Sequence, residues 1–258
     1  MTVLYPSPVF GPVHSRRLGV SLGVNLLPAD GKRCTFDCIY CECGYNKDSR
    51  KGQKMPSRIE VSTALRARLA DMKTNGPKPD VITFAGNGEP TIHPQFPEIL
   101  DDVIALRNEF FPQCKISVLS NATQIVKPAV FEALKKVDNN ILKLDTVSDA
   151  YIRALDKPVS STYSVDAVIE KMKEYGKSCI IQTMFLGGTH EGKDMRNTSD
   201  EYVRPWLETV KAIGPKCVMI YTIDRETPSP LLEKATKKEL DDIADKVRDC
   251  GIECSVSY

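Results

Sequence analysis

Short apolar runs alternate with longer amphipathic segments along most of this sequence. The apolar runs are rich in β-branched side chains, which is typical of strands buried on both faces of a parallel sheet. On this basis we expect strands at residues 21–27, 81–85, 115–120, 140–145, 179–185, 217–223 and 252–257.

The amphipathic segments between these runs have helical spacing. Four apolar residues from Val61 to Met72 fall on one face of a helix expected over 62–72, and Asn75-Gly76-Pro77 ends it. The same spacing predicts five further helices, at 97–110, 127–136, 163–175, 200–213 and 236–249. The last of these opens with Thr236 and Glu239, the spacing of a capping box.

Strict alternation of seven strands and six helices predicts an α/β protein with a parallel sheet and right-handed crossovers. Both an incomplete (β/α) barrel and an open doubly wound sheet satisfy this order. No linker-like stretch interrupts it, so we expect one domain over residues 1–258: an N-terminal extension (1–20), a core (20–250) and a terminal strand (251–258). In either architecture a functional site forms at the carboxyl ends of the strands.

Composition narrows the class of protein only a little. With 258 residues, 41% hydrophobic and 27% charged, the chain is typical of globular proteins, and its net charge of +1 disfavours a strongly nucleic-acid-like surface overall. It has no apolar run of about 18 residues and no signal-peptide pattern at its start, so we expect a cytoplasmic protein without membrane contact.

Four of the nine cysteines lie within ten positions: Cys34, Cys38, Cys41 and Cys43. Thiols stay reduced in the cytosol, so this spacing favours a metal centre over disulfides. Three thiolates would leave one metal position open, whereas Cys43 as a fourth ligand would close a zinc site. A structural zinc ribbon usually takes its ligands from two separated pairs, and no second pair lies nearby. We expect the other five cysteines, which lie near strand starts or a helix end, to be small buried hydrophobes, with a second cluster at that end of the sheet as the alternative.

Polar and glycine-rich segments follow the expected strands. They are GNGEPTIHP (86–94), SNAT (120–123), Asp145, the long loop 186–199 and Asp224-Arg225-Glu226. Residues of these types are also common in turns, so capping is the alternative to a functional role for Ser120, Asn121 and Asp145.

The cysteine segment and the first of these polar segments resemble motifs of one family. CTFDCIYC resembles the CxxxCxxC signature of the radical SAM superfamily, with Tyr40 before the last cysteine, and GNGEP resembles its GGEP-type motif. The order of elements extends the resemblance over residues 20–250. It implies a partial (β/α)6 barrel with a short final strand, and a [4Fe–4S] cluster held by Cys34, Cys38 and Cys41 with Cys43 as a neighbour.

The resemblance also implies an activity. S-adenosylmethionine would bind the unique iron, and its one-electron reductive cleavage would give methionine and a 5′-deoxyadenosyl radical that abstracts hydrogen from a substrate. Such an iron–sulfur oxidoreductase needs an external one-electron donor of the flavodoxin or ferredoxin kind. The residues implied to contact S-adenosylmethionine are Tyr40, Gly86, Asn87, Gly88, Glu89, Pro90, Ser120, Asn121 and Asp145.

The segment GPVHSRRLGVSLGVNLLP and the continuation TIHP resemble the small iron–sulfur oxidoreductases related to wyosine-type tRNA-modifying enzymes. They imply an RNA or nucleoside substrate, with phosphates met by Arg16, Arg17, Lys32, Arg33, Lys47, Arg50, Lys51, Lys54 and Arg58. Wyosine-forming enzymes carry a second cluster on cysteines upstream of this motif, whereas no cysteine precedes Cys34 here, and this departure argues against the specific wyosine reaction. Action on a protein or peptide, and a metal-binding module without catalysis, are the alternatives.

Overall fold

A single curved sheet forms the centre of the computed structural model, which describes residues 2–15, 19–48, 52 and 54–258. Its eight strands lie in chain order: β1 (Val9–Ser15), β2 (Gly19–Val24), β3 (Val81–Phe84), β4 (Lys115–Ser120), β5 (Asn139–Lys143), β6 (Ile180–Met184), β9 (Cys217–Tyr221) and β11 (Cys254–Ser257). β1 pairs antiparallel with β2, and every later pairing is parallel.

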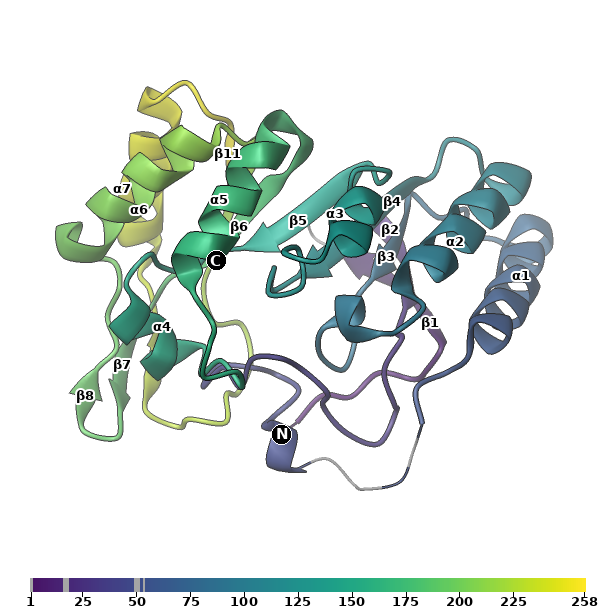
Figure 1. Cartoon of the computed structure of the whole chain (residues 1–258), viewed down its shortest axis with the longest axis horizontal. Coiled ribbons are helices and arrows are strands. Elements are labelled where there is room, and N and C mark those ends of the chain that lie inside the picture. Colours follow the sequence, from purple (N-terminus) through teal and green to yellow (C-terminus); the bar gives the residue numbers. More distant parts are fainter. Residues whose placement is uncertain (1, 16–18, 49–51, 53) are drawn as a thin grey trace.

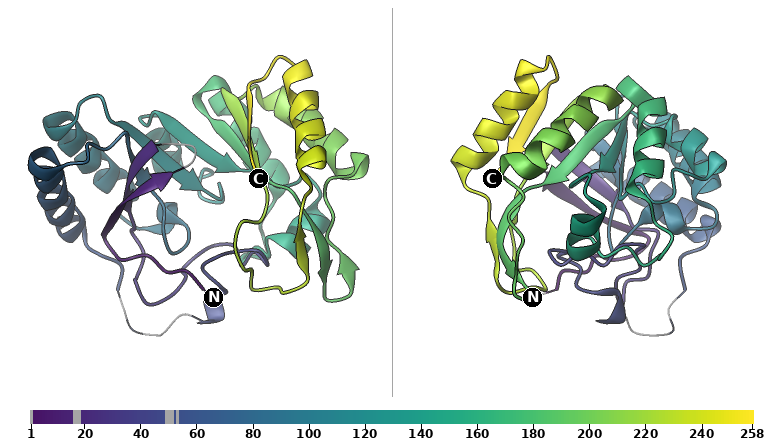
Figure 2. Two further views of the ribbon diagram at one scale, coloured as in Figure 1. Left: turned by 180° about the vertical axis from the view of Figure 1, so that it is seen from behind. Right: turned by 60° about the vertical axis from the view of Figure 1, so that its left-hand side comes forward.

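The strand order decides between the two architectures that the sequence left open. A doubly wound sheet reverses its strand order at a switch point, whereas here each strand lies beside the next one along the chain. The described strands therefore form a partial barrel, with β1 and β11 as its two edges. Figures 1 and 2 show this open, curved sheet.

Helices cover the outer face of the sheet (Figures 1 and 2). They are α1 (Arg58–Asn75), α2 (Phe96–Phe110), α3 (Pro128–Leu134), α5 (Val165–Tyr175), α6 (Asp200–Ile213) and α7 (Lys237–Asp249). The short helix α4 (Asp149–Leu155) lies beyond the strand ends and packs against residues 36–40 (Figure 1). The chain also has the 3₁₀ turns η1 (Asn46–Asp48), η2 (Pro90–Ile92) and η3 (Gly176–Ser178). The main core lies between these helices and the sheet and includes fully buried Leu22, Phe84 and Phe96. None of the described helices is long and apolar enough to cross a membrane.

The seven predicted parallel strands and six predicted helices are all present, with ends shifted by a few residues. Three features were not predicted: β1, the short helix α4, and a second sheet. That sheet is formed by β7 (Leu186–His190), β8 (Lys193–Asp194) and β10 (Leu232–Lys234), in the order β10-β7-β8. Its strands β7 and β8 fall within the segment 186–199, which we expected to be a long loop.

The cysteines outside the loop do not form a second centre. Cys114 and Cys179 are buried in the main core and Cys254 packs against it. Cys217 lies on the opposite face of the sheet from Cys254, because Cys254 pairs in register with Val218. The expectation of buried hydrophobic residues is thus met by Cys114 and Cys179, whereas Cys217, Cys250 and Cys254 are only partly buried.

Polar residues line the inner face of the partial barrel. Ser21 and Thr83 share a hydrogen bond of 2.8 Å across β2 and β3, and Asn139 donates to Ser117 at 2.9 Å across β4 and β5. These polar groups share the inner face with apolar residues such as Ile141 and Met219, and together they line an open cavity in the barrel interior.

The small sheet is attached to α7 by Arg196, which follows β8 and donates to the Glu239 carboxylate at the start of α7. Replacing Glu239 tests this attachment. Burial would raise the pKa of Glu239, but hydrogen bonds from Thr198 and Thr236 and the charge of Arg196 lower it to about 2. Because the pKa of Glu239 is lower in the folded than in the unfolded protein, its ionised carboxylate stabilises the fold at pH values above the ordinary pKa of a glutamate. This stabilisation is lost as the pH falls toward about 2. We expect Glu239→Gln to reduce the free energy of unfolding by about 1 kcal/mol at neutral pH, and by less in acid.

Urea denaturation at neutral pH and at about pH 3 measures this difference. The exposed Glu208→Gln on α6 is the control and should change stability little at either pH. An equal effect of Glu239→Gln at both pH values would contradict the assigned ion pair.

Candidate active site

The loop that carries Cys34, Cys38, Cys41 and Cys43, called the cysteine loop below, follows β2. Backbone contacts hold it on both sides. Arg33 pairs with Gly88 in a short parallel bridge, and Phe36 pairs with Pro158. The Asn46 side chain joins the end of the loop to its start. Its oxygen accepts from Cys34 N at 3.0 Å and its nitrogen donates to Cys34 O at 3.1 Å. Asn46 carries no sequence signal of this role, because its partners are backbone groups 12 residues away.

Cys34, Cys38 and Cys41 line one cavity of about 620 Å³. Its walls also include the glycine turn after β3 and inward-facing residues of the strands, such as Ser21, Thr83 and Gln182. This volume is within the range typical of small-molecule and cofactor sites. The cavity lies at the carboxyl ends of the parallel strands, where the sequence analysis expects the site.

A buried cation stands beside the three thiols. Lys32 is 2% exposed and donates to Asp37 at 3.3 Å. Burial by itself would lower the pKa of Lys32, but the neighbouring Cys41, Cys38 and Cys34, together with Asp37, raise it well above its ordinary value. The buried ammonium group of Lys32 therefore favours negative charge on the sulfur atoms of these cysteines. Lys32, predicted to meet phosphates, is instead turned inward.

The thiols differ in their readiness to ionise. Burial, and then the charge of Glu89, raise the pKa of Cys34 to about 12, and burial also raises that of Cys38. A hydrogen bond from Cys43 lowers the pKa of Cys41 to about 6. A metal centre that binds all three as thiolates would thus release protons on binding.

Two N–H groups point at the Cys34 sulfur. Phe36 N and Asn121 Nδ2 each lie 3.4 Å from Cys34 Sγ, and Asn121 Nδ2 also donates to Thr35 at 2.8 Å. Hydrogen bonds to ligating sulfur are one of the means by which proteins set the potential of an iron–sulfur cluster. The structure thus brings Asn121, which the sequence motif implies as a contact of S-adenosylmethionine, to the sulfur of Cys34.

The GNGEP turn after β3 is packed against the cysteine loop at Gly88. Arg33 N donates to Asn87 O at 2.8 Å, and Glu89 N donates to Arg33 O at 3.1 Å. Gly88 has φ +134°, and a Cβ atom on it would lie 1.8 Å from Arg33 O. Only glycine fits this position, because a side chain would collide with backbone that cannot move aside.

The Glu89 carboxylate is fully committed to hydrogen bonds within the protein. It accepts from Asn121 N at 2.6 Å, from Ser120 Oγ at 2.9 Å and from Thr91 N at 3.1 Å. These bonds join the turn after β3 to the end of β4. These bonds give the Glu89 carboxylate a structural role in the site, whereas the sequence motif implies a contact with S-adenosylmethionine.

The Asn87 side chain points away from the cavity. It accepts from Tyr5 N at 2.8 Å and donates to Tyr5 O at 2.9 Å, so it holds the N-terminal segment across the turn. Any contact of Asn87 with a bound molecule would therefore come from its backbone. Gly86, Pro90 and Ser120 remain close to the cavity, and Gly86 and Ser120 line it.

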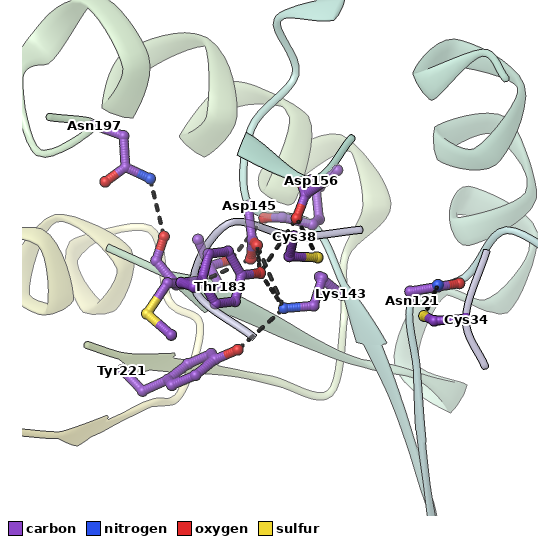
Figure 3. A network of polar contacts seen from close by, with 12 residues as sticks. Cys34, Cys38, Asn121, Lys143, Asp145, Asp156, Thr183, Asn197 and Tyr221 are labelled. Atoms are coloured by element: carbon purple, nitrogen blue, oxygen red, sulfur yellow. Dashed lines mark hydrogen bonds and ion pairs between the residues drawn. The ribbon is translucent and has the colours of Figure 1, made fainter. Parts of the chain in front are cut away.

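A polar network on β5 connects the cysteine loop to β9 (Figure 3). Lys143 Nζ donates to Tyr40 OH at 2.5 Å, to Tyr221 OH at 3.1 Å and to Asp145 Oδ2 at 3.3 Å. Tyr40 OH donates in turn to Asp145 and Asp156. Lys143 thus lies at the centre of the network, within the cavity wall.

Asp145 differs from its predicted role. Its side chain is fully buried, and besides Lys143 and Tyr40 it accepts from Met184 N at 2.9 Å. Direct contact with a ribose or substrate would require these bonds to break, so the arrangement favours Lys143 as the cavity-facing group of β5. A lysine within the otherwise apolar run of NILKLD was the available signal for this residue, and the sequence analysis missed it.

Asp156 is a second residue that the sequence did not indicate. It follows α4, and its Oδ1 accepts from Cys38 Sγ at 3.2 Å, while Oδ2 has no hydrogen-bond partner among the described residues. Burial, and then the charge of Asp145, raise the pKa of Asp156 to about 8. Burial beside Cys38 thus favours the neutral form of this carboxyl.

The remaining sequence candidates lie in structural contacts. Arg225 forms an ion pair with Glu42 at 2.7 Å rather than with Glu226, and His93 bonds the backbone of Pro56 and Gln95. Arg58 is paired with Asp102 at 2.6 Å. The predicted phosphate contacts Arg16, Arg17, Arg50 and Lys51 lie outside the described residues.

The donor set fits an iron–sulfur cluster. Three thiols on one loop face a cavity beside buried cations, with N–H donors on one sulfur. Within the described part of the chain, no three His, Cys, Asp or Glu side chains converge on one metal-ion position. A cluster has a different requirement, because its cysteines bind separate iron atoms.

The family model of the radical SAM superfamily matches residues 30–200, more than half of the chain, and includes both motifs of the site. The chain therefore belongs to the radical SAM superfamily. It is an enzyme of this class, and membership implies S-adenosylmethionine and an iron–sulfur cluster as cofactors.

UPF0026 proteins are among the sequence relatives of this chain. One from Helicobacter pylori (strain J99) is 31% identical over 238 residues, covering 91% of this chain and 71% of the relative. One from Methanocaldococcus jannaschii is 29% identical, covering 88% and 68%.

Solved radical SAM enzymes share the fold. A radical SAM methyltransferase from Sphaerobacter thermophilus superposes with a TM-score of 0.67 at 15% identity, covering 92% of this chain and 66% of that one. For Streptococcus suis SuiB bound to S-adenosylmethionine the values are 0.63 and 16%, covering 89% and 49%. TYW1 with a lysine-pyruvate adduct gives 0.59 at 13%, covering 89% and 73%. The chain thus spans about half to two thirds of the first two enzymes.

The contact between Gly88 and the cysteine loop gives a test of the site's construction. We expect Gly88→Ala to lower the free energy of unfolding by about 3 kcal/mol or more, because its Cβ would collide with Arg33 O. Gly192→Ala is the control: its φ is +76° but nothing lies within 4 Å of the added atom. It should cost about 1 kcal/mol, the strain of the backbone alone.

Urea denaturation of the metal-free proteins measures both values. Equal losses for the two variants would show that backbone strain alone, and not the contact with Arg33, makes glycine necessary at position 88.

Proposed function

We propose that this enzyme holds a [4Fe–4S] cluster on Cys34, Cys38 and Cys41 and cleaves S-adenosylmethionine reductively at that cluster. When bound, the cofactor supplies a 5′-deoxyadenosyl radical that abstracts hydrogen from the substrate. The observation that carries this proposal is the convergence of the three thiols and the GNGEP turn on one cavity beside Lys32.

The residues of the chain have separate tasks in this proposal. The exposed backbone of Gly86 to Pro90 would approach the methionyl end of S-adenosylmethionine, since glycine permits such closeness. Ser120 and Asn121 lie at the adjoining end of β4, and Tyr40 would meet the cofactor only at its ring because its hydroxyl is bonded internally. The cluster takes its electron from an external donor of the flavodoxin or ferredoxin kind.

An RNA or nucleoside is our proposed substrate, on the resemblance of the segment before the cysteines to wyosine-type enzymes. The described basic residues give this less support than expected, because Lys32 is buried and Arg58 is paired. Modification of a protein or peptide is the second candidate, and the fold shared with SuiB, also solved bound to its precursor peptide SuiA, favours it.

Loss of a cluster ligand tests the reaction. The protein is purified without oxygen, reconstituted with iron and sulfide, and given dithionite and S-adenosylmethionine. We expect 5′-deoxyadenosine from the wild type and at least about a hundredfold less from Cys38→Ala, because a cluster with two protein ligands is not retained. The matched control is Cys114→Ala, which removes a buried thiol far from the loop and should keep full activity.

Iron content and chromatography of product measure both effects. If the wild type binds zinc instead and yields no 5′-deoxyadenosine, the cysteine loop is a structural metal site and the proposed reaction is wrong.

Salt dependence tests the RNA substrate. We expect affinity for tRNA to fall about tenfold or more between roughly 50 and 200 mM salt, as it does for proteins that neutralise several phosphates. Replacing the exposed Lys47 and Lys54 with alanine should weaken binding, while Lys238→Ala on α7 should not. Salt-independent or absent binding in a filter or anisotropy assay would favour the peptide candidate.

A further inference from the structure

Four tyrosines line the cavity, and their hydroxyl groups have different partners. Tyr40 is buried and its hydroxyl lies between Asp145 and Asp156. The Tyr258 hydroxyl is bonded to Asp241 and Lys237 on α7, and the Tyr5 hydroxyl lies 3.5 Å from Arg225 at the mouth. Tyr221 alone among the four is carried by the inner face of a parallel strand of the barrel, β9, with a half-buried side chain.

Tyr221 is connected to the cysteine loop through one cation. Lys143 Nζ lies 3.1 Å from Tyr221 OH and 2.5 Å from Tyr40 OH, and Tyr40 directly precedes Cys41 (Figure 3). These contacts fix the Tyr221 hydroxyl on the wall that it shares with the three cysteines. A phenol is thereby positioned beside the space in which radicals would form.

We propose that Tyr221 is a hydrogen-atom donor to carbon radicals formed in this cavity. The inference rests on the proposed function. In the step, the phenolic O–H bond breaks and a C–H bond forms at the radical carbon, leaving a neutral tyrosyl radical. One electron from the external donor and one proton from water then restore the phenol.

The chemistry of the two bonds gives this step its direction. A phenolic O–H bond is weaker than an alkyl C–H bond, so transfer to an alkyl radical runs downhill. The Lys143 charge at 3.1 Å opposes loss of an electron from the ring alone, because a radical cation would face an ammonium group. Tyr221 therefore gives up the proton and the electron together.

The proposal also limits the class of reaction. Direct return of hydrogen to an unchanged substrate radical would regenerate the substrate. The substrate radical must therefore rearrange or lose a bond before Tyr221 quenches it, and the product carries a hydrogen that came from a solvent-exchangeable site.

Deuterium from solvent tests the donor without knowledge of the substrate. The reconstituted full-length protein is exchanged into D₂O and given S-adenosylmethionine and dithionite, with no other substrate, so that Tyr221 would quench the 5′-deoxyadenosyl radical itself. We expect the wild-type 5′-deoxyadenosine to carry one solvent deuterium. In Tyr221→Phe, the deuterium per molecule of product should fall by about fivefold or more.

Tyr258→Phe is the control, because it removes a hydroxyl of the same cavity that is turned toward α7; its deuterium content should equal that of the wild type. Freeze-quenched samples provide a second readout. A tyrosyl radical signal in the electron paramagnetic resonance spectrum should be present in the wild type and Tyr258→Phe and lost in Tyr221→Phe.

The outcomes separate this inference from the proposed function. Product without deuterium in the wild type, or with equal deuterium in Tyr221→Phe, overturns the donor while the proposed reaction stands. Absence of 5′-deoxyadenosine from the wild type overturns both. Circular dichroism and iron content of each variant show whether it has folded and holds its cluster.

Discussion

Backbone pairing between Arg33 and Gly88 holds the cysteine loop against the turn that follows β3. Two hydrogen bonds form this contact, and the 1.8 Å approach of Arg33 O to the place of a missing Cβ makes glycine necessary there. The cavity exists because these two segments, about 50 residues apart in the chain, meet at the carboxyl ends of the neighbouring strands β2 and β3. From there Glu89 extends the connection to β4, so the loop, the turn and the strand end form one unit.

Electrostatics of the cavity follow from the same packing. Lys32 and Lys143 are buried cations on two sides of the cysteine loop, and both have a pKa above the ordinary value although burial alone would lower it. Such groups are costly to bury unless negative charge compensates them. The carboxylates Asp37 and Asp145 provide part of that charge, and the Cys41 thiol, whose pKa is lowered to about 6, provides more. Cys34 and Cys38, whose pKa values are raised, would add negative charge on sulfur only when a cofactor binds them.

The partial barrel also explains where chemistry can take place. Its interior is lined by hydroxyl and amide side chains together with apolar ones such as Ile141 and Met219, and the N-terminal segment crosses its mouth through Asn87 and Tyr5. Protein would partly enclose a reactive intermediate formed there. In that setting, the identity of the nearest weak X–H bond decides how a radical ends, which is why the position of Tyr221 matters.

Sequence alone determined the order of the parallel strands and helices, the cysteine loop and the glycine turn. These signals are local: each depends on spacing within a few residues, and that spacing is fixed by helix and strand geometry. Tertiary structure decided which side chains face the cavity. The Asp145 side chain is buried away from the cavity, while Lys143 faces the cavity. Asn87 bonds the backbone of Tyr5, and Asp156, which follows a helix too short to predict, accepts from Cys38. These roles depend on contacts between residues far apart in the chain, which no local pattern encodes.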